Sequence, residues 1–162
     1  MAVKKITEYP EEVLAKVGEP VTEFGAELEE LTRDMFETMY DAEGVGLAAP
    51  QIGLSLRLFV MDCEGIKLVA ANPEVIATEG EQSGQEGCLS VGKVPAVLAR
   101  AHKATLRAQD IKGEWFEQTA EGYAARAFQH ETDHCNGILF IDRLPKLRRG
   151  MVIKRFKKEK KW

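Results

Sequence analysis

Residues 130–134 read HETDH, an HExxH pattern in which two histidines stand four positions apart. Successive residues of an α-helix rotate by about 100°, so His130 and His134 share one helix face and can bind one metal ion together. Glu131 stands beside them without having to ligate. From there a carboxylate can take a proton from a metal-bound water and return it to a leaving group. The chain has only three histidines, which favours a hydrolytic metal site over two unrelated surface histidines.

A catalytic metal usually takes three protein ligands and keeps one position open for water. The acidic residues after His134, Asp142 and Glu159, are not at the spacing of the third ligand in metzincins or thermolysin. The third ligand should therefore come from upstream. Cys88 is the strongest candidate, because the sequence EGCLS at 86–90 favours a tight, exposed turn in which a thiolate would be a strong ligand.

The other candidate ligands fit structural roles better. Cys63 follows a β-rich run, Cys135 would point about 100° away from His134 around a helix, and His102 next to Lys103 is typical of a solvated surface. Carboxylates upstream of the motif remain alternatives. The three cysteines are irregularly spaced and odd in number, so they do not indicate a disulfide framework.

The elements that must position these residues can be predicted from periodicity. Residues 123–136, rich in Ala and free of Pro, predict a helix that ends at Gly137. Residues 26–40 predict an amphipathic helix, followed by a glycine-rich loop at 43–51. The expected strands span residues 56–61, 66–70, 104–109, 114–119 and 138–141.

The first four of these strands form two hairpins, and the second hairpin turns at residues 110–113, DIKG. Beyond Pro145 we expect a basic C-terminal helix or tail at 146–162. The sequence therefore predicts an α+β fold: one domain, 1–162, with antiparallel β-sheets around a central HExxH helix, an N-terminal helix and a basic C-terminal helix.

Composition restricts the class of protein and its partners. Hydrophobic residues at 44% and charged residues at 30% are typical of a globular chain. No run approaches the ~20 apolar residues of a membrane span, and no apolar segment follows the early lysines, so we expect a cytoplasmic protein that does not enter a membrane. A net charge of −4 argues against specific DNA binding. The basic segment 146–162 is either a solvated tail or a surface that contacts an anionic partner.

Three motifs together resemble those of the peptide deformylase family, in the same order and at similar separations. They are GVGLAAPQ at 44–51, EGCLS at 86–90 and QHETDH at 129–134. The resemblance extends to 34–40 and 137–144, so it covers nearly the whole chain. It implies hydrolytic removal of the formyl group from the N-terminal formylmethionine of nascent polypeptides by a monomeric enzyme.

The resemblance also implies catalytic roles. Glu131 would be the general acid and base that activates a metal-bound water. The Gln51 side chain and the Leu89 backbone N–H would stabilise the oxyanion that forms at the formyl group. The implied metal ligands are Cys88, His130 and His134. Iron(II) is the first expectation for the metal, and zinc, nickel and cobalt suit the same ligands.

Substrate contacts follow from the same resemblance. The backbone of Gly44, Val45 and Gly46 would pair with the substrate peptide as if a strand were added. Further contacts are implied for Gly87, Tyr123, Arg126 and Ala127. Arg126 would cover the methionine side chain with its aliphatic stem while its charge reaches water.

The chain departs from the family pattern after Ser90. Similar proteins usually run through a Pro-Gly pair to Val-Pro-Arg, whereas residues 91–100 read VGKVPAVLAR. The spacing to Arg100 is kept, and the resemblance implies an Arg100 to Glu86 contact that fixes the Cys88 loop. The altered stretch borders the substrate side, so it leaves the preference for residues after methionine open.

Two other functions remain alternatives at this stage. A small HExxH peptidase would need a third ligand other than Cys88. A noncatalytic, metal-stapled binding module would need neither Glu131 nor Gln51. The resemblance further implies that the basic C-terminal helix docks on the ribosome.

Overall fold

The computed structural model describes residues 2–160, which form three helices and two antiparallel sheets, with every strand between the first and the second helix. The helices are α1 (Ala26–Asp41), α2 (Gly122–Cys135) and α3 (Lys146–Lys160). The strands are β1 (Gly46–Ala48), β2 (Leu58–Cys63), β3 (Ile66–Glu79), β4 (Gln82–Glu86), β5 (Ala96–Arg100), β6 (Lys103–Gln109) and β7 (Trp115–Glu121). Short 3₁₀ helices span Glu12–Ala15, Ala49–Ile52, Leu89–Val91 and Phe140–Arg143.

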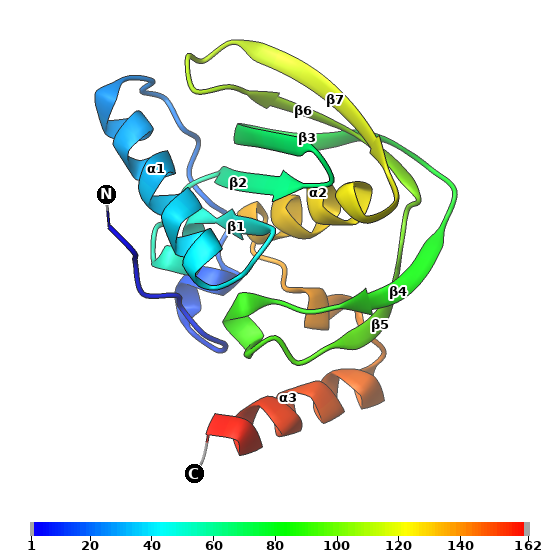
Figure 1. Ribbon diagram of the computed structural model, residues 1–162. Coiled ribbons are helices and arrows are strands. Elements are labelled where there is room, and N and C mark those ends of the chain that lie inside the picture. The colour runs from blue at the N-terminus through cyan, green and yellow to red at the C-terminus, as the bar shows by residue number, and fades with distance from the viewer. Residues whose placement is uncertain (1, 161–162) are drawn as a thin grey trace.

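The larger sheet has five strands in the order β1-β2-β3-β6-β7, and β4 pairs with β5 in a separate hairpin. Helix α2 contacts all five strands of the sheet. Figure 1 shows α2 at the centre of the molecule, with the sheet on one side and the β4–β5 hairpin on the other. The helix is therefore covered on two sides, and its polar residues become interior residues.

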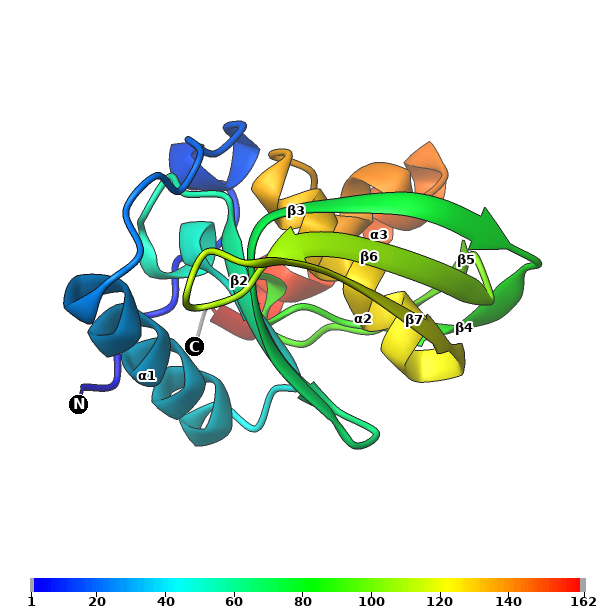
Figure 2. The ribbon, with the colours of Figure 1, turned by 90° about the horizontal axis from the view of Figure 1, so that it is seen from above.

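Three apolar clusters hold these layers together. The first joins α2 to the sheet through Phe128, Phe59 and Leu106. The second places α1 on the strands through Met35 and Met39; Figure 2, viewed from above, shows α1 at the end of the molecule opposite β4 and β5. Burial of each large side chain stabilises the fold by roughly 1.5–3 kcal/mol.

The third cluster attaches α3 to the β4–β5 hairpin. Val152 and Phe156 of α3 pack with Leu98 of β5 and with Phe140. The Phe156 ring lies so close to Gly92 that a Cβ at this glycine would meet it at 2.9 Å. The remaining face of α3 is exposed and basic.

The predicted α+β class is confirmed, as are the helices at 26–40 and 123–136 and both predicted hairpins. The basic helix after Pro145 is also confirmed as far as Lys160, while residues 161 and 162 lie outside the described part of the chain. The strand predicted at 138–141 is wrong. Phe140–Arg143 is a 3₁₀ helix, because the Asp142 carboxylate accepts the Leu139 N–H at 2.9 Å. The side chains of Phe140 and Ile141 pack into the third cluster.

Within residues 2–160, no helix combines the length and the apolar character needed to cross a membrane.

Two glycines at the ends of α2 give a stability test. Both have positive φ, +63° at Gly122 and +76° at Gly137, which costs an L-residue about 1–2 kcal/mol. A Cβ at Gly122 would meet nothing within 4 Å, whereas one at Gly137 would lie 2.8 Å from the Ala15 carbonyl oxygen. We expect Gly137→Ala to lower the free energy of unfolding by about 1–3 kcal/mol more than Gly122→Ala, because it adds overpacking. Equal losses in urea denaturation would contradict this account.

Candidate metal centre

Three residues from two elements meet at the inner face of α2. The ligand atoms of Cys88, His130 and His134 all lie within 4.8 Å of one another, and all three residues are buried. Cys88 Sγ is 3.4 Å from His134 Nε2. The two histidines come from successive turns of α2, with ring centroids 5.0 Å apart, and Cys88 comes from the loop that follows β4. The residues predicted as ligands are therefore brought together.

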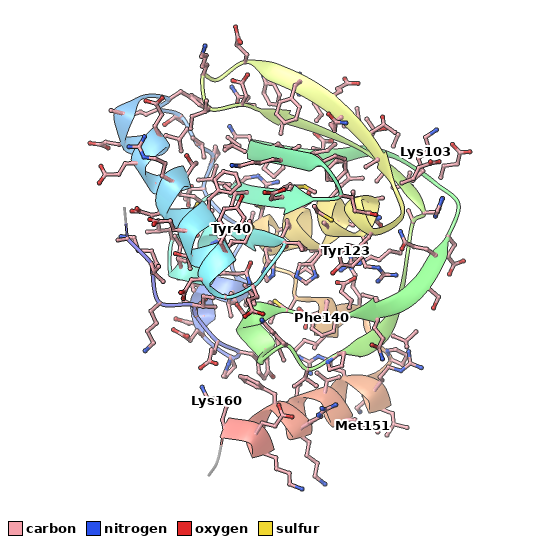
Figure 3. The ribbon with its side chains drawn as sticks, in the orientation of Figure 1. Tyr40, Lys103, Tyr123, Phe140, Met151 and Lys160 are labelled. Carbon is pink, nitrogen blue, oxygen red and sulfur yellow. The ribbon has the colours of Figure 1, made fainter. Side chains whose placement is uncertain are left out.

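The orientation of His130 defines which of its nitrogens can ligate. Its Nδ1 lies 2.6 Å from Glu86 Oε2, which leaves Nε2 free to face Cys88 and His134. Metal-ligating histidines commonly make such a contact to a carboxylate through their other nitrogen. Phe140, labelled in Figure 3, packs behind the same ring with centroids 6.2 Å apart. His130 is thus fixed from two sides.

The electrostatics of this cluster suit a divalent cation. Burial lowers the pKa of His134 well below its ordinary value, which keeps its imidazole neutral. Burial also acts to lower the pKa of His130, but the neighbouring Glu131 and Cys88 outweigh it and raise that pKa. A proton is therefore attracted to the place that a cation would take. Two imidazoles and one thiolate fit zinc, iron(II), cobalt or nickel.

Glu131 lies beside the ligand atoms in a closed environment. Its Oε2 is 4.0 Å from His130 Nε2, and its buried Oε1 has no hydrogen-bond partner among residues 2–160. Burial raises the pKa of Glu131 to about 7, although His130 opposes this. A Cβ at Gly46 would lie 2.5 Å from Oε2, so β1 can approach the carboxylate only because glycine occupies that position.

The other candidate ligands take no part in this cluster. Cys63 and Cys135 are buried in the first apolar cluster. Burial raises the pKa of Cys63 to about 11 and that of Cys135 to about 12, so both remain thiols. His102 is exposed beside β6. The structural roles predicted for these residues agree with their positions.

A buried ionic network supports the centre from behind. Arg100 donates two hydrogen bonds to Glu86, at 2.6 and 3.1 Å, which confirms the predicted contact. Arg126 donates a third at 2.8 Å. Burial acts to raise the pKa of Glu86, but the bonds from His130 and Arg100 outweigh it and hold that pKa well below its usual range. Glu86 is therefore ionised inside the protein.

Sequence reasoning missed the far end of this network. Arg100 also donates to Asp133 at 2.7 Å, and Arg143 binds the same carboxylate through two hydrogen bonds of 2.6 and 2.7 Å. An acid inside the HExxH pattern, on a helix expected to be central, is the signal that could have revealed it. A buried carboxylate requires a cationic partner.

The expectation for Arg126 was wrong in one respect. Its charge does not reach water: the residue is 2% exposed and its guanidinium is neutralised by Glu86. The physical reason is the β4–β5 hairpin, which covers this side of α2. Arg126 does line a cavity beside His130, and in this respect its position matches the expectation.

Gln51 and Leu89 flank the sulfur of Cys88. Gln51 Oε1 accepts the Ala48 N–H at 2.9 Å, which fixes the amide so that its Nε2 faces Ser90 Oγ at 3.2 Å and Cys88 Sγ at 3.6 Å. Leu89 begins the 3₁₀ helix directly after Cys88. Two residues predicted as donors to an oxyanion therefore adjoin the ligands.

A cavity of about 220 Å³ opens onto this centre. It is lined by all seven residues predicted to contact substrate: Gly44, Val45, Gly46, Gly87, Tyr123, Arg126 and Ala127. Figure 3 shows Tyr123 at the first turn of α2. A larger hollow of about 630 Å³ reaches Arg100 but includes none of the ligand residues in its lining.

This arrangement is typical of a metal-dependent hydrolase: an HExxH helix, a cysteine from a separate loop beside both histidines, and a buried glutamate with one oxygen that has no partner among residues 2–160. The family model described as polypeptide deformylase matches residues 3–150. Over 163 residues the chain is 50% identical to a peptide deformylase of Acidobacterium capsulatum, covering 98% of this chain and 96% of that protein.

Solved structures agree. A crystal structure of a peptide deformylase from Legionella pneumophila matches with a TM-score of 0.94 and 48% identity, covering 98% and 96% of the two chains. The crystal structure of the Ehrlichia chaffeensis peptide deformylase in complex with actinonin matches with a TM-score of 0.91 and 32% identity, covering 100% of both chains. The chain belongs to the polypeptide deformylase family, enzymes that remove N-terminal formyl groups from nascent peptides. The alternatives of an HExxH peptidase and a noncatalytic module are not supported.

The ionic network can be tested through Glu86. We expect Glu86→Gln to weaken divalent metal binding by about 10- to 100-fold, because His130 loses the carboxylate that orients it. The free energy of unfolding should fall by about 3–5 kcal/mol, because Arg100 and Arg126 lose a buried partner. Chelator competition and urea denaturation measure the two effects.

The control is Glu114→Gln, the same substitution at a residue that is exposed. Unchanged metal affinity in a folded Glu86→Gln protein would rule out the orienting role.

Proposed function

We propose that this chain removes the formyl group from N-terminal formylmethionine by hydrolysis, with Cys88, His130 and His134 holding a divalent metal and Glu131 moving the proton. One observation supports this most directly. The Glu131 carboxylate is buried beside the ligand atoms and keeps one oxygen without a partner among the described residues. A structural metal site needs no such group.

The metal would supply a Lewis acid that acidifies water and polarises the formyl oxygen. Iron(II) is the metal that the family resemblance favours, and the same three residues suit zinc, nickel or cobalt. The remaining steps are assigned to side chains. Glu131 would accept a proton from the attacking water and transfer it to the amine that leaves.

Charge that develops on the formyl oxygen would be stabilised by two fixed dipoles. The Gln51 amide is held by the Ala48 N–H, so its own N–H groups are already directed at the cysteine side of the cavity. The Leu89 backbone N–H would be the second donor. Donors that are oriented before the reaction need no rearrangement in the transition state.

The substrate peptide would bind along β1. This strand lies at the edge of the five-stranded sheet, so one side of its backbone has no strand partner in the described chain. An extended peptide can add to such an edge by main-chain hydrogen bonds. The methionine side chain would enter the cavity beside Tyr123, Arg126 and Ala127, and Gly87 would contact the peptide from the opposite loop.

The role of Glu131 is tested with formyl-Met-Ala-Ser and metal-loaded protein purified without oxygen. We expect Glu131→Gln to release formate about 10²- to 10⁴-fold more slowly while it still binds one equivalent of metal, because an amide cannot accept the proton. Glu117→Gln, exposed on β7, should match the wild type. A wild-type protein that holds a full equivalent of metal and releases no formate would refute the proposed function.

We also propose that the chain acts in the cytoplasm as a monomer and docks on the ribosome through α3. All the proposed ligands come from one chain, which is consistent with a monomer. Val152 and Phe156 fix one face of α3 to the protein, and Lys154, Lys157 and Lys158 are exposed on the rest of the helix. Met151 and Lys160, labelled in Figure 3, lie on this outlying helix. Its exposed lysines could meet the phosphates of ribosomal RNA.

Charge reversal tests this docking without removing the buried anchors of α3. The triple variant Lys154→Glu, Lys157→Glu, Lys158→Glu changes only exposed residues of the helix. We expect it to cosediment with ribosomes with an affinity reduced about tenfold or more, because attraction becomes repulsion. The control changes Lys5, Lys16 and Lys112 to Glu, which are exposed elsewhere and give the same net charge. Equal cosedimentation of both triple variants would contradict docking through α3.

A further inference from the structure

Two exposed residues of opposite charge line the cavity mouth on different loops. Glu43 lies in the loop between α1 and β1, and Lys93 lies in the loop between the 3₁₀ helix Leu89–Val91 and β5. The two loops approach closely, since a Cβ at Gly44 would lie 3.0 Å from the Leu89 side chain. A peptide that leaves the centre along β1 therefore passes between a wall that carries an acid and a wall that carries a base.

Neither charge is neutralised within residues 2–160. No ion pair or side-chain hydrogen bond joins Glu43 or Lys93 to another described residue. The other charged groups of the lining differ, because Arg126 and Glu86 bind each other in the interior and Glu131 is buried. Glu43 and Lys93 are thus the charges of this lining that remain free to attract a side chain of the substrate.

The backbone at both positions is unusual. Glu43 has φ +58° and Lys93 has φ +61°, in the left-handed region where glycine is least strained. Lys93 also holds its loop in place, because its N–H donates to the Cys88 carbonyl at 3.0 Å. A Cβ at Gly87 would meet the Lys93 carbonyl at 3.4 Å. The side chain of Lys93 therefore starts from a backbone fixed beside the ligand loop.

We propose that Glu43 and Lys93 select the charge of the two residues that follow formylmethionine. Successive side chains of an extended peptide point to opposite sides. One of the two residues then faces Lys93 and favours Asp or Glu, and the other faces Glu43 and favours Lys or Arg. This inference rests on the proposed function and specifies its substrate class: formylated chains that carry an acidic and a basic residue directly after methionine.

The experiment measures kcat/KM for formate release from formyl-Met-X-Ala-Ser and formyl-Met-Ala-X-Ser, with X as Asp, Asn or Lys, by metal-loaded protein. Each value is divided by that of the Asn peptide, so that a general loss of activity cancels. We expect the wild type to prefer Asp at one position and Lys at the other by about two- to fivefold, the range of exposed ion pairs. Both preferences should weaken in 1 M salt, which screens exposed charges.

The exchange of the two charges is the decisive variant. Glu43→Lys with Lys93→Glu leaves the net charge of the chain unchanged, so long-range attraction of peptides is the same. We expect it to invert both preferences, and the two single variants to show which wall each position faces. Lys112→Glu, exposed in the β6–β7 turn and outside the cavity lining, should leave the ratios unaltered.

Two outcomes would overturn the inference alone, and a third would also overturn the proposed function. Equal rates with Asp, Asn and Lys at both positions, or preferences that survive the charge exchange, would show that Glu43 and Lys93 do not select substrates. In both cases the Asn peptides are still deformylated, so the proposed function stands. Failure of the wild type to release formate from any of the peptides would refute the proposed function and this inference together.

Discussion

The buried carboxylate of Glu86 is the constraint on which the rest of the site depends. It ends β4, receives Arg100 from β5 and receives Arg126 and His130 from α2. One ionised group therefore ties the hairpin to the central helix and sets the position of Cys88, two residues along the chain. Buried ion pairs contribute little net stability compared with apolar side chains of the same size, but they are costly to break. The main effect of the network is therefore to position His130 and the Cys88 loop, and its contribution to stability is secondary.

Close approach of backbone and side chain is the second constraint. β1 lies against Glu131 because Gly46 has no side chain, and the Gly44 loop contacts Leu89 for the same reason. The result is a carboxylate closed off from water on the sheet side and open only toward the cavity. A proton acceptor in such surroundings keeps a raised pKa, and water reaches it only through the space that the substrate would fill.

Much of this arrangement could be predicted from the sequence, because local signals determine it. Helical spacing located α1 and α2, and Gly113 located the β6–β7 turn. The β4–β5 hairpin was missed, since QSGQE at 82–86 is polar and pairs through its backbone, with alternate residues buried only once β5 is in place. The burial of Arg126 followed from that hairpin and could not be foreseen without it. Asp133 and Arg143 were missed because their contact depends on how the chain returns after α2.

The charges around the HExxH residues and those at the cavity mouth lie in different surroundings. At the centre, two carboxylates and two guanidinium groups are buried and paired with one another, so a change to any of them disturbs the residues around Cys88 and His130. They are Glu86, Asp133, Arg100 and Arg126. At the mouth, Lys93 contributes its backbone to the Cys88 loop but leaves its ammonium in solvent. Solvent screens a charge there from the metal centre, while a bound peptide can contact it directly. Within the stretch in which this chain departs from its family's pattern, the side chain of Lys93 can therefore vary, provided that its backbone still holds Cys88.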